Sequence, residues 1–294
     1  MKSGVKRTTP YKVISIIILV ILAILFLFPL YWIVTGAFKP TTDIYASQPV
    51  WWPSEWVTSN FEKLFTKRSA PLFEIGALVG PTVPAAIRWL VNTVFMSVAA
   101  MLLTCITAAM AGYALAKKRF VGRALLFSLI ICAMALPKQV ILIPLLKEMS
   151  ALKLYGSLWA VIFPTVGWPF GVFLMKQFCE GVPGEMLEAA RIDGASEART
   201  FISVVLPMVK PGIGALAIFT FINSWNDYFM QLVMLPNSAN FTISLGIATL
   251  QGESSVDTGL LMSGAALAAV PIIVVFLIFQ KYFTQGITMG AVKG

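Results

Sequence analysis

Long apolar runs constrain the fold of this chain more than any other feature of its sequence. The first run covers residues 13–34 and follows four basic residues within positions 1–12. A run of this length forms a helix that crosses a hydrocarbon core of about 30 Å. Because lysine and arginine favour the cytoplasmic side of a membrane, we expect a cytoplasmic N-terminus. A signal peptide would have a shorter apolar region and a small-residue cleavage site, so we expect this run to stay as the first span.

Five more apolar runs follow the first. Hydrophobic residues make up 58% and charged residues 12% of the chain, whereas soluble domains are about one quarter charged. We therefore predict an all-α fold, a polytopic membrane protein with six transmembrane helices and both termini cytoplasmic. The later spans are expected at residues 89–115, from 124 through Pro137 and Lys138, at 157–178, at 211–222 and at 260–279. The chain thus divides into a tail (1–12), a six-helix domain (13–281) and a C-terminal tail (282–294).

The distribution of basic residues agrees with this topology in most places. A basic cluster within residues 117–123 follows the second span on the expected cytoplasmic side. Lys147 and Lys153, by contrast, fall in a short segment that is expected outside, where the charge rule should hold. This short segment is the point at which the sequence supports the topology least.

A charged stretch interrupts the apolar pattern between the fourth and fifth predicted spans. Within residues 181–207 the order is Glu188, Ala189, Ala190, then Asp193 and Gly194, and finally Leu206 and Pro207. Glycine is a poor helix former and serine a good helix cap, so Gly194 should end one helix and Ser196 begin the next. We expect two short helices joined by a bend along a membrane face. The spacing of these residues favours a docking surface over a solvated amphipathic connector, which composition alone would allow.

This spacing resembles the cytoplasmic "EAA" loop of ABC importer permeases. Two further stretches resemble the carbohydrate-uptake branch, which includes the smaller permease of maltose-type importers. They are Phe-Ile-Asn-Ser-Trp-Asn-Asp-Tyr at 221–228 and Gln-Gly-Ile-Thr-Met-Gly-Ala-Val-Lys-Gly at 285–294. The resemblance implies a permease subunit of an ATP-driven importer, located as a multi-pass protein in a bacterial or archaeal cell membrane. It also implies a second permease, a pair of ATP-hydrolysing subunits and an external binding protein that delivers a sugar or oligosaccharide.

The resemblance implies functional roles for three groups of residues. The charged stretch would contain the coupling helices that sit in a cleft of the ATPase, with candidates Glu188, Ala189, Ala190, Asp193, Gly194, Leu206 and Pro207. The C-terminal tail would be a second ATPase contact through Gly290, Lys293 and Gly294, a frayed end being the alternative. An outside loop before the last span would approach the binding protein through Gln251, Gly252 and Glu253.

Polar side chains in or beside the spans are the candidates for a transport pathway. They are Lys138, Gln139, Asn223 and Asn226. A lysine at the bilayer centre costs about 2.5 to 3.5 kcal/mol on insertion scales. Lys138 should therefore face protein or water, or extend to the interface. A structural role for all four stays open, because in some members of the family only the partner permease holds the sugar.

Several other functions are excluded by missing motifs. No Gly-x-x-x-x-Gly-Lys-Ser/Thr loop occurs, so we expect a separate subunit, not this chain, to hydrolyse ATP. The chain has no histidine, and its three cysteines lack metal-ligand spacing, so we predict no enzyme activity, metal or cofactor. The basic residues sit beside apolar runs, which indicates membrane lipid rather than nucleic acid as their partner.

An ion-coupled secondary transporter or a channel without an ATPase partner is the alternative from another class. Such a transporter more usually carries acidic residues deep in the membrane. The interior of the predicted spans contains none. The charged stretch at 181–207 points instead to an ATPase.

Overall fold

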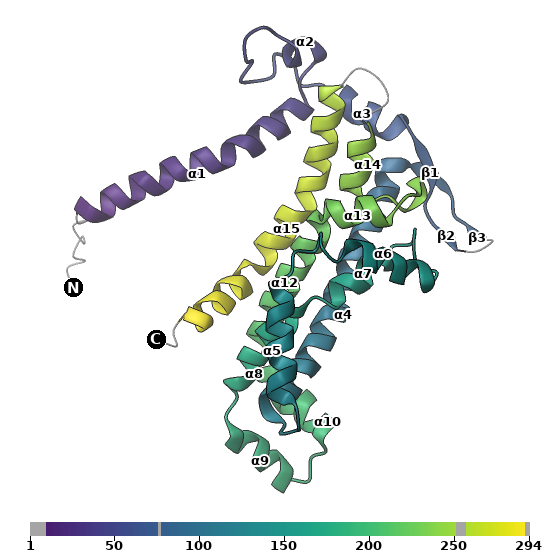
Figure 1. Cartoon of the computed structure of the whole chain (residues 1–294). Coiled ribbons are helices and arrows are strands. Elements are labelled where there is room, and N and C mark those ends of the chain that lie inside the picture. Colours follow the sequence, from purple (N-terminus) through teal and green to yellow (C-terminus); the bar gives the residue numbers. More distant parts are fainter. Residues whose placement is uncertain (1–9, 76–77, 251–256, 292–294) are drawn as a thin grey trace.

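The computed structural model describes residues 10–75, 78–250 and 257–291, and helices make up 74% of these residues (Figure 1). By length and composition, the described residues contain four helical segments that can cross a membrane, or five if one sharply bent pair counts as a span. The four are α1 (Pro10–Ala37), α4 (Ala85–Lys117), α7 with α8 (Trp159–Val166 and Pro169–Glu180) and α15 (Thr258–Ala291). The fifth is α12 (Lys210–Asn226), bent by 77° from the helical segment before it.

The third predicted span is not one helix, so that part of the prediction is wrong. Helix α5 (Arg123–Met134) ends before Pro137 and Lys138, and turns lead from there to α6 (Leu142–Ala151). Proline lacks the backbone N–H that a helix needs, and it disfavours helical geometry in the residue before it. The chain therefore leaves the helix where the sequence analysis expected it to continue.

The fourth predicted span is interrupted as well. Helix α7 ends at Val166, and α8 begins at Pro169. Trp168 between them has an extended backbone, with ψ of 127°. Proline is favoured at the first position of a helix because that position has no intrahelical N–H bond to lose. Pro169 thus starts α8 rather than merely kinking a continuous helix.

The segment between α1 and α4 corrects the all-α prediction. It contains the short helices α2 (Thr41–Ile44) and α3 (Ser59–Thr66), followed by four short strands. Strand β1 (Ser69–Pro71) pairs antiparallel with β4 (Thr82–Pro84), and β2 (Glu74–Ile75) pairs with β3 (Leu78–Val79). The apolar residues here are too few and too interrupted by glycine and proline to cross the membrane as a helix. The chain reverses on itself and satisfies its backbone groups in two narrow ladders instead.

Helix α4 lies at the centre of the bundle and packs closely on α8 and α12. The contact with α8 depends on small residues. A Cβ atom on Gly112 would lie 2.7 Å from the backbone nitrogen of Lys176, and one on Gly171 would lie 3.2 Å from the Cβ of Ala108. Small residues let membrane helices approach each other at backbone distance, which maximises van der Waals contact.

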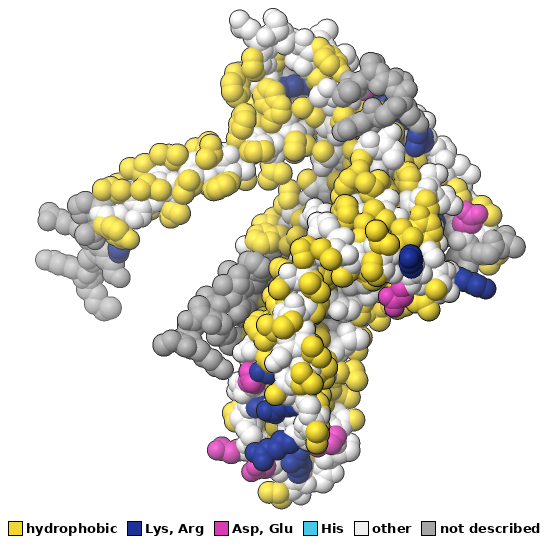
Figure 2. All heavy atoms as spheres, in the orientation of Figure 1, with side chains coloured by type: hydrophobic (Ala, Val, Ile, Leu, Met, Phe, Trp, Pro, Cys, Tyr) yellow, Lys and Arg dark blue, Asp and Glu magenta, His cyan; other side chains and the backbone are white. Residues whose placement is uncertain are grey.

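Helix α1 projects away from the rest of the described structure (Figure 1). Its apolar side chains are exposed along most of its length and form a continuous hydrophobic surface (Figure 2). Burial begins only at its C-terminal end, where Thr35 is 4% and Ala37 0% exposed. That end packs against α15, the last helix that the structure describes.

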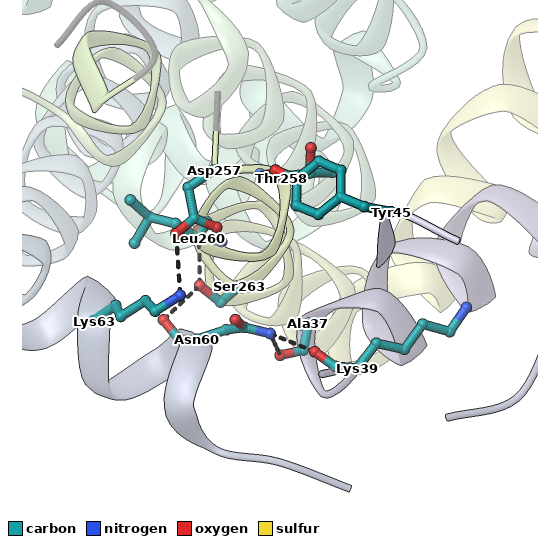
Figure 3. Close-up of polar contacts among 9 residues, drawn as sticks. All are labelled: Ala37, Lys39, Tyr45, Asn60, Lys63, Asp257, Thr258, Leu260 and Ser263. Carbon is teal, nitrogen blue, oxygen red and sulfur yellow. Dashed lines mark hydrogen bonds and ion pairs between the residues drawn. The ribbon is translucent and has the colours of Figure 1, made fainter. Parts of the chain in front are cut away.

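A group of polar contacts joins the ends of α1, α3 and α15 (Figure 3). The Asn60 side chain donates hydrogen bonds to the carbonyl oxygens of Ala37, at 3.1 Å, and Lys39, at 2.9 Å. The Ser263 hydroxyl donates to the Asn60 carbonyl at 3.2 Å, and Lys63 pairs with Asp257 at 3.2 Å. We call these contacts the outer corner. They connect the first and last long helices through α3.

Candidate functional site

The charged stretch folds as the sequence predicts, with two helical segments joined by a bend. Helix α9 (Gly184–Ile192) is followed by Gly194, whose φ of +76° lies in the left-handed region that favours glycine. The N–H of Ala195 donates to the carbonyl of Ala190 at 2.9 Å and closes the end of α9. The hydroxyl of Ser196 then accepts from the N–H of Arg199 at 3.3 Å and caps α10 (Glu197–Thr200).

Beyond α10 the chain departs from a regular helix. Residues Phe201–Val205 form a π-helical turn, in which the N–H of Leu206 donates to the carbonyl of Phe201. Helix α11 (Leu206–Met208) follows and contains Pro207, before the 77° bend into α12. Such π-turns are rare and occur often at functional sites. The sequence analysis did not predict this turn.

The bend presents a mixed apolar and acidic surface. Glu188, Ala189, Asp193 and Gly194 are exposed, whereas Ala190 and Leu187 are buried. Within the described part of the chain, the Glu188 side chain makes no hydrogen bond or ion pair. Met186 is 48% and Ile192 87% exposed beside these acids. We call the residues Glu185, Met186, Glu188, Ala189, Ile192 and Asp193 the coupling surface; the sequence analysis did not select its two apolar members, Met186 and Ile192.

The Glu197 side chain connects the bend to the end of α4. Its carboxylate pairs with Lys118, and it accepts hydrogen bonds from the Tyr113 hydroxyl at 3.1 Å and from Arg191 at 3.2 Å. The hydrogen bond from Lys118 is the main cause that lowers the pKa of Glu197. Basic and acidic side chains gather at this end of the molecule, around α9 and α10 (Figure 2). The coupling surface is therefore held to the central helix of the bundle.

A second feature is a cavity of about 670 Å³, which we call the chamber. It lies at the end of α5, at the break between α7 and α8, and at the start of α13 (Tyr228–Met234). The Lys138 ammonium pairs with the Asp227 carboxylate at 2.7 Å and lies 5.1 Å from the centre of the Trp168 ring. The second oxygen of Asp227 accepts from the N–H of Met230 at 3.3 Å and caps α13.

The other predicted pathway residues do not line the chamber. Asn223 donates to the carbonyl of Phe219 at 2.8 Å and Asn226 to that of Ile222 at 2.9 Å, so each amide bonds within its own helix. Gln139 is exposed beside Lys138. The chamber instead brings Lys138 together with residues that the sequence analysis did not select, Asp227 and Trp168. Trp168 stands between Gly167 and Pro169, a sequence that signals a break in the helix.

The remaining predicted contacts are only partly described. Gln251, Gly252 and Glu253 lie outside the described residues, as do Lys293 and Gly294. Gly290 lies near the end of α15. Within the described part of the chain, no group of three or more potential metal ligands comes together.

Residues 107–289 match the family described as the binding-protein-dependent transport system inner membrane component. The chain belongs to this family. The matched range includes the coupling surface, the Glu197 contacts and the chamber. It begins within α4, so it leaves out α1 and the segment between α1 and α4 with its strands. An inner membrane component of this kind is a permease, and ATP hydrolysis lies in a separate subunit.

Relatives of this inner membrane component are similar over nearly their full length. The arabinooligosaccharides transport system permease protein AraQ of Halalkalibacterium halodurans is 33% identical, over 93% of each chain. The protein of the same name from Bacillus subtilis is 31% identical, over 97% of this chain and 96% of the relative. The trehalose transport system permease protein SugB of Mycobacterium tuberculosis is 28% identical, over 99% of this chain and 100% of the relative.

A solved structure shares the fold of this inner membrane component. It is a chain of a bacterial ABC transporter involved in the import of the acidic polysaccharide alginate. The TM-score is 0.76 at 20% identity, covering 96% of this chain and 99% of that chain. The fold of the described residues is therefore that of an ABC importer permease.

Proposed function

We propose that this chain is a membrane-spanning permease subunit of an ATP-driven importer. With a second permease it forms the translocation pathway for a sugar or oligosaccharide, which an external binding protein delivers. The observation that carries the proposal is the similarity over more than nine tenths of the chain to permeases named for arabinooligosaccharide transport. The same similarity counts against an ion-coupled transporter that works without an ATPase.

The proposal includes six membrane crossings. They are α1, α4, α5 with the turns that follow it, α7 with α8, α12 and α15. Both tails (1–12 and 282–294) would be cytoplasmic and the strands outside, with residues 13–281 as the membrane domain. The basic residues near the end of α4 and the start of α5, between Lys117 and Arg123, support a cytoplasmic location for that turn.

The coupling surface is the proposed contact with the ATPase pair. Glu188 is an exposed acid whose side chain has no partner among the described residues, and Ile192 is an exposed apolar side chain. Both suit a partner protein that pairs with the acid and buries the apolar side chain. Leu206 and Pro207 would carry the motion of α9 into α12 through the 77° bend. Gly290, Lys293 and Gly294 are proposed as a further ATPase contact, and Gln251, Gly252 and Glu253 as the contact with the binding protein.

A pull-down from mild-detergent membranes of the host tests this function. The tagged wild type should bring down an ATPase and a second permease, identified by mass spectrometry. A variant with Glu188→Ala and Gly194→Pro should lose the ATPase, because proline cannot adopt a φ of +76°.

The matched control carries Glu62→Ala and Gly122→Pro. Glu62 is an exposed acid on α3, and Gly122 lies at a second cytoplasmic turn, with a φ of +82°. It should keep the ATPase. Absence of an ATPase from the wild type, or equal loss in both variants, would refute the coupling role of α9.

A further inference from the structure

The geometry points to the chamber as a sugar-binding subsite of this chain, selective for uncharged oligosaccharides. In it, Trp168 supplies the stacking face, and the Lys138–Asp227 pair supplies the hydrogen bonds. The inference rests on the proposed function and adds the site and the chemical class of the cargo.

The chamber is built from breaks in three separate crossings. Helix α5 ends at Met134, α8 begins at Pro169, and the chain leaves α12 at Asp227, all beside one cavity. Helix α8 has 12 residues, so the chamber lies about 18 Å from its cytoplasmic end. Irregular backbone at membrane depth is tolerated only where it is buried in protein or lines a water-filled cavity. The three coincident breaks therefore surround one cavity at membrane depth, which is lined mainly by apolar residues and by the charged residues Lys138, Asp227 and Glu148.

The walls of the chamber have the composition of a small-molecule site. Its volume of about 670 Å³ lies within the range of about 300 to 1,000 Å³ of ligand pockets, which are mostly apolar with a few placed polar groups. Trp168 and Phe163 provide aromatic faces, against which the C–H groups of a sugar ring can pack. These rings give the site its apolar part.

The ion pair provides the polar part of the site. An ammonium has three N–H donors, and within the described residues Lys138 uses one of them, on Asp227. Sugar hydroxyls both donate and accept, so they can take the free donors of Lys138 and the unused lone pairs of Asp227. The capping bond to Met230 fixes the carboxylate in place.

The charge of the chamber selects the class of sugar. Its lining contains one basic residue, Lys138, and two acidic ones, Asp227 and Glu148. The charge of Lys138 is already balanced by Asp227 at 2.7 Å, and Glu148 is a further anion. On binding, a uronate or other acidic sugar would give up the water around its carboxylate. The chamber offers no unpaired cation to replace that hydration. An uncharged oligosaccharide has no charged group to desolvate, so its binding does not carry this free-energy cost.

The test uses the complete complex in proteoliposomes, with its ATPase pair, second permease and binding protein. ATP-dependent uptake is measured for uncharged trisaccharides, arabinotriose and maltotriose, and for an acidic alginate trisaccharide. The wild type should take up at least one uncharged sugar and exclude the acidic one. Trp168→Ala should lower uptake of the uncharged sugar at least about tenfold, as expected when a specific ligand contact is lost.

Asp227→Asn gives the sharper result. Asparagine still caps α13 through its amide oxygen, so the fold is kept, but Lys138 loses its counter-charge. Uptake of the uncharged sugar should fall at least about tenfold, and uptake of the acidic sugar should appear. The control is Glu180→Gln, which removes the partner of another lysine on the bundle, Lys176 at 2.7 Å, away from the chamber. It should leave both rates unchanged.

The outcomes separate the two proposals. If the wild type imports uncharged sugar but Trp168→Ala and Asp227→Asn do so at the wild-type rate and KM, the chamber is not the subsite and the importer function stands. Import of the acidic sugar by the wild type would overturn the charge selection. If the complete wild-type complex imports no sugar under ATP, the proposed function fails and this inference with it.

Discussion

Gly194 has a conformation that other residues adopt only at a cost. Its φ is +76°, yet no other atom lies within 4 Å of where a Cβ would stand. A side chain here would therefore meet open space, and the penalty would come from the backbone alone. Gly122 has the same properties, with a φ of +82° and nothing within 4 Å. The two glycines form a natural pair for separating backbone strain from function.

We predict that Gly194→Val and Gly122→Val destabilise the protein by similar amounts, about 1 to 2 kcal/mol. Only Gly194→Val should also reduce the amount of ATPase that co-purifies, because only Gly194 lies on the bend of the coupling surface. Thermal unfolding in detergent measures the first effect and quantitative co-purification the second. An equal loss of ATPase in both variants would contradict the prediction.

Glu197 should make the bend sensitive to acid. The hydrogen bond from Lys118 is the main reason that its pKa lies below the ordinary value in the folded state. Its stabilising effect is therefore complete above the ordinary glutamate pKa of about 4.3 and disappears as the pH falls through the lower folded-state value. Glu197→Gln should lower the unfolding temperature of the complex slightly at neutral pH, and this difference should vanish in acid. A difference that stays constant into acid would exclude this role.

At the scale of the helices, close packing between α4 and α8 depends on Gly112, which has no side chain. We predict that Gly112→Ala destabilises the protein by about 1 to 3 kcal/mol, as overpacked cores do. The new Cβ would lie 2.7 Å from backbone atoms of α8, so the two helices would have to separate. Thermal unfolding in detergent measures the effect. Gly184→Ala, where no other atom lies within 4 Å, is the control and should change little.

The long helices were predictable because their apolar runs are uninterrupted. Helices α1, α4 and α15 cover the expected runs and extend beyond them. The bend at Gly194 and the cap at Ser196 were predictable too, because both depend on local chemistry. The end of α5 before Pro137 was missed because hydropathy alone does not report a helix break. The strands between α1 and α4 were missed because they are very short and, within the described residues, pair with each other.

The chamber could be predicted only in part. Lys138 was selected because a lysine within an apolar run is unusual. Its pairing with Asp227 joins residues 89 positions apart, and no local periodicity links two positions so distant in the sequence. Trp168 contributes through a break between α7 and α8, whose geometry depends on the helices that pack around it.

At the scale of the whole molecule, the six proposed crossings give a definite prediction for chemical labelling. In a variant with Cys105, Cys132 and Cys179 replaced by alanine, a membrane-impermeant maleimide should label Ser54→Cys and Ser150→Cys in intact cells. Val121→Cys should react only after the membrane is permeabilised. Labelling of position 150 from outside would resolve the conflict created by Lys147 and Lys153. Labelling only from inside would require a different topology.

The outer corner also has a consequence for how the chain is made. Asn60 binds the end of α1 early in the sequence, but its contact with Ser263 needs a helix that lies 203 residues further along the chain. Contacts between residues so far apart in sequence form slowly. Helix α1 should therefore insert early during translation and wait, docked at its outer end by α3 alone, until α15 has been synthesised. Docking of α1 into the bundle would then be limited by the synthesis of α15.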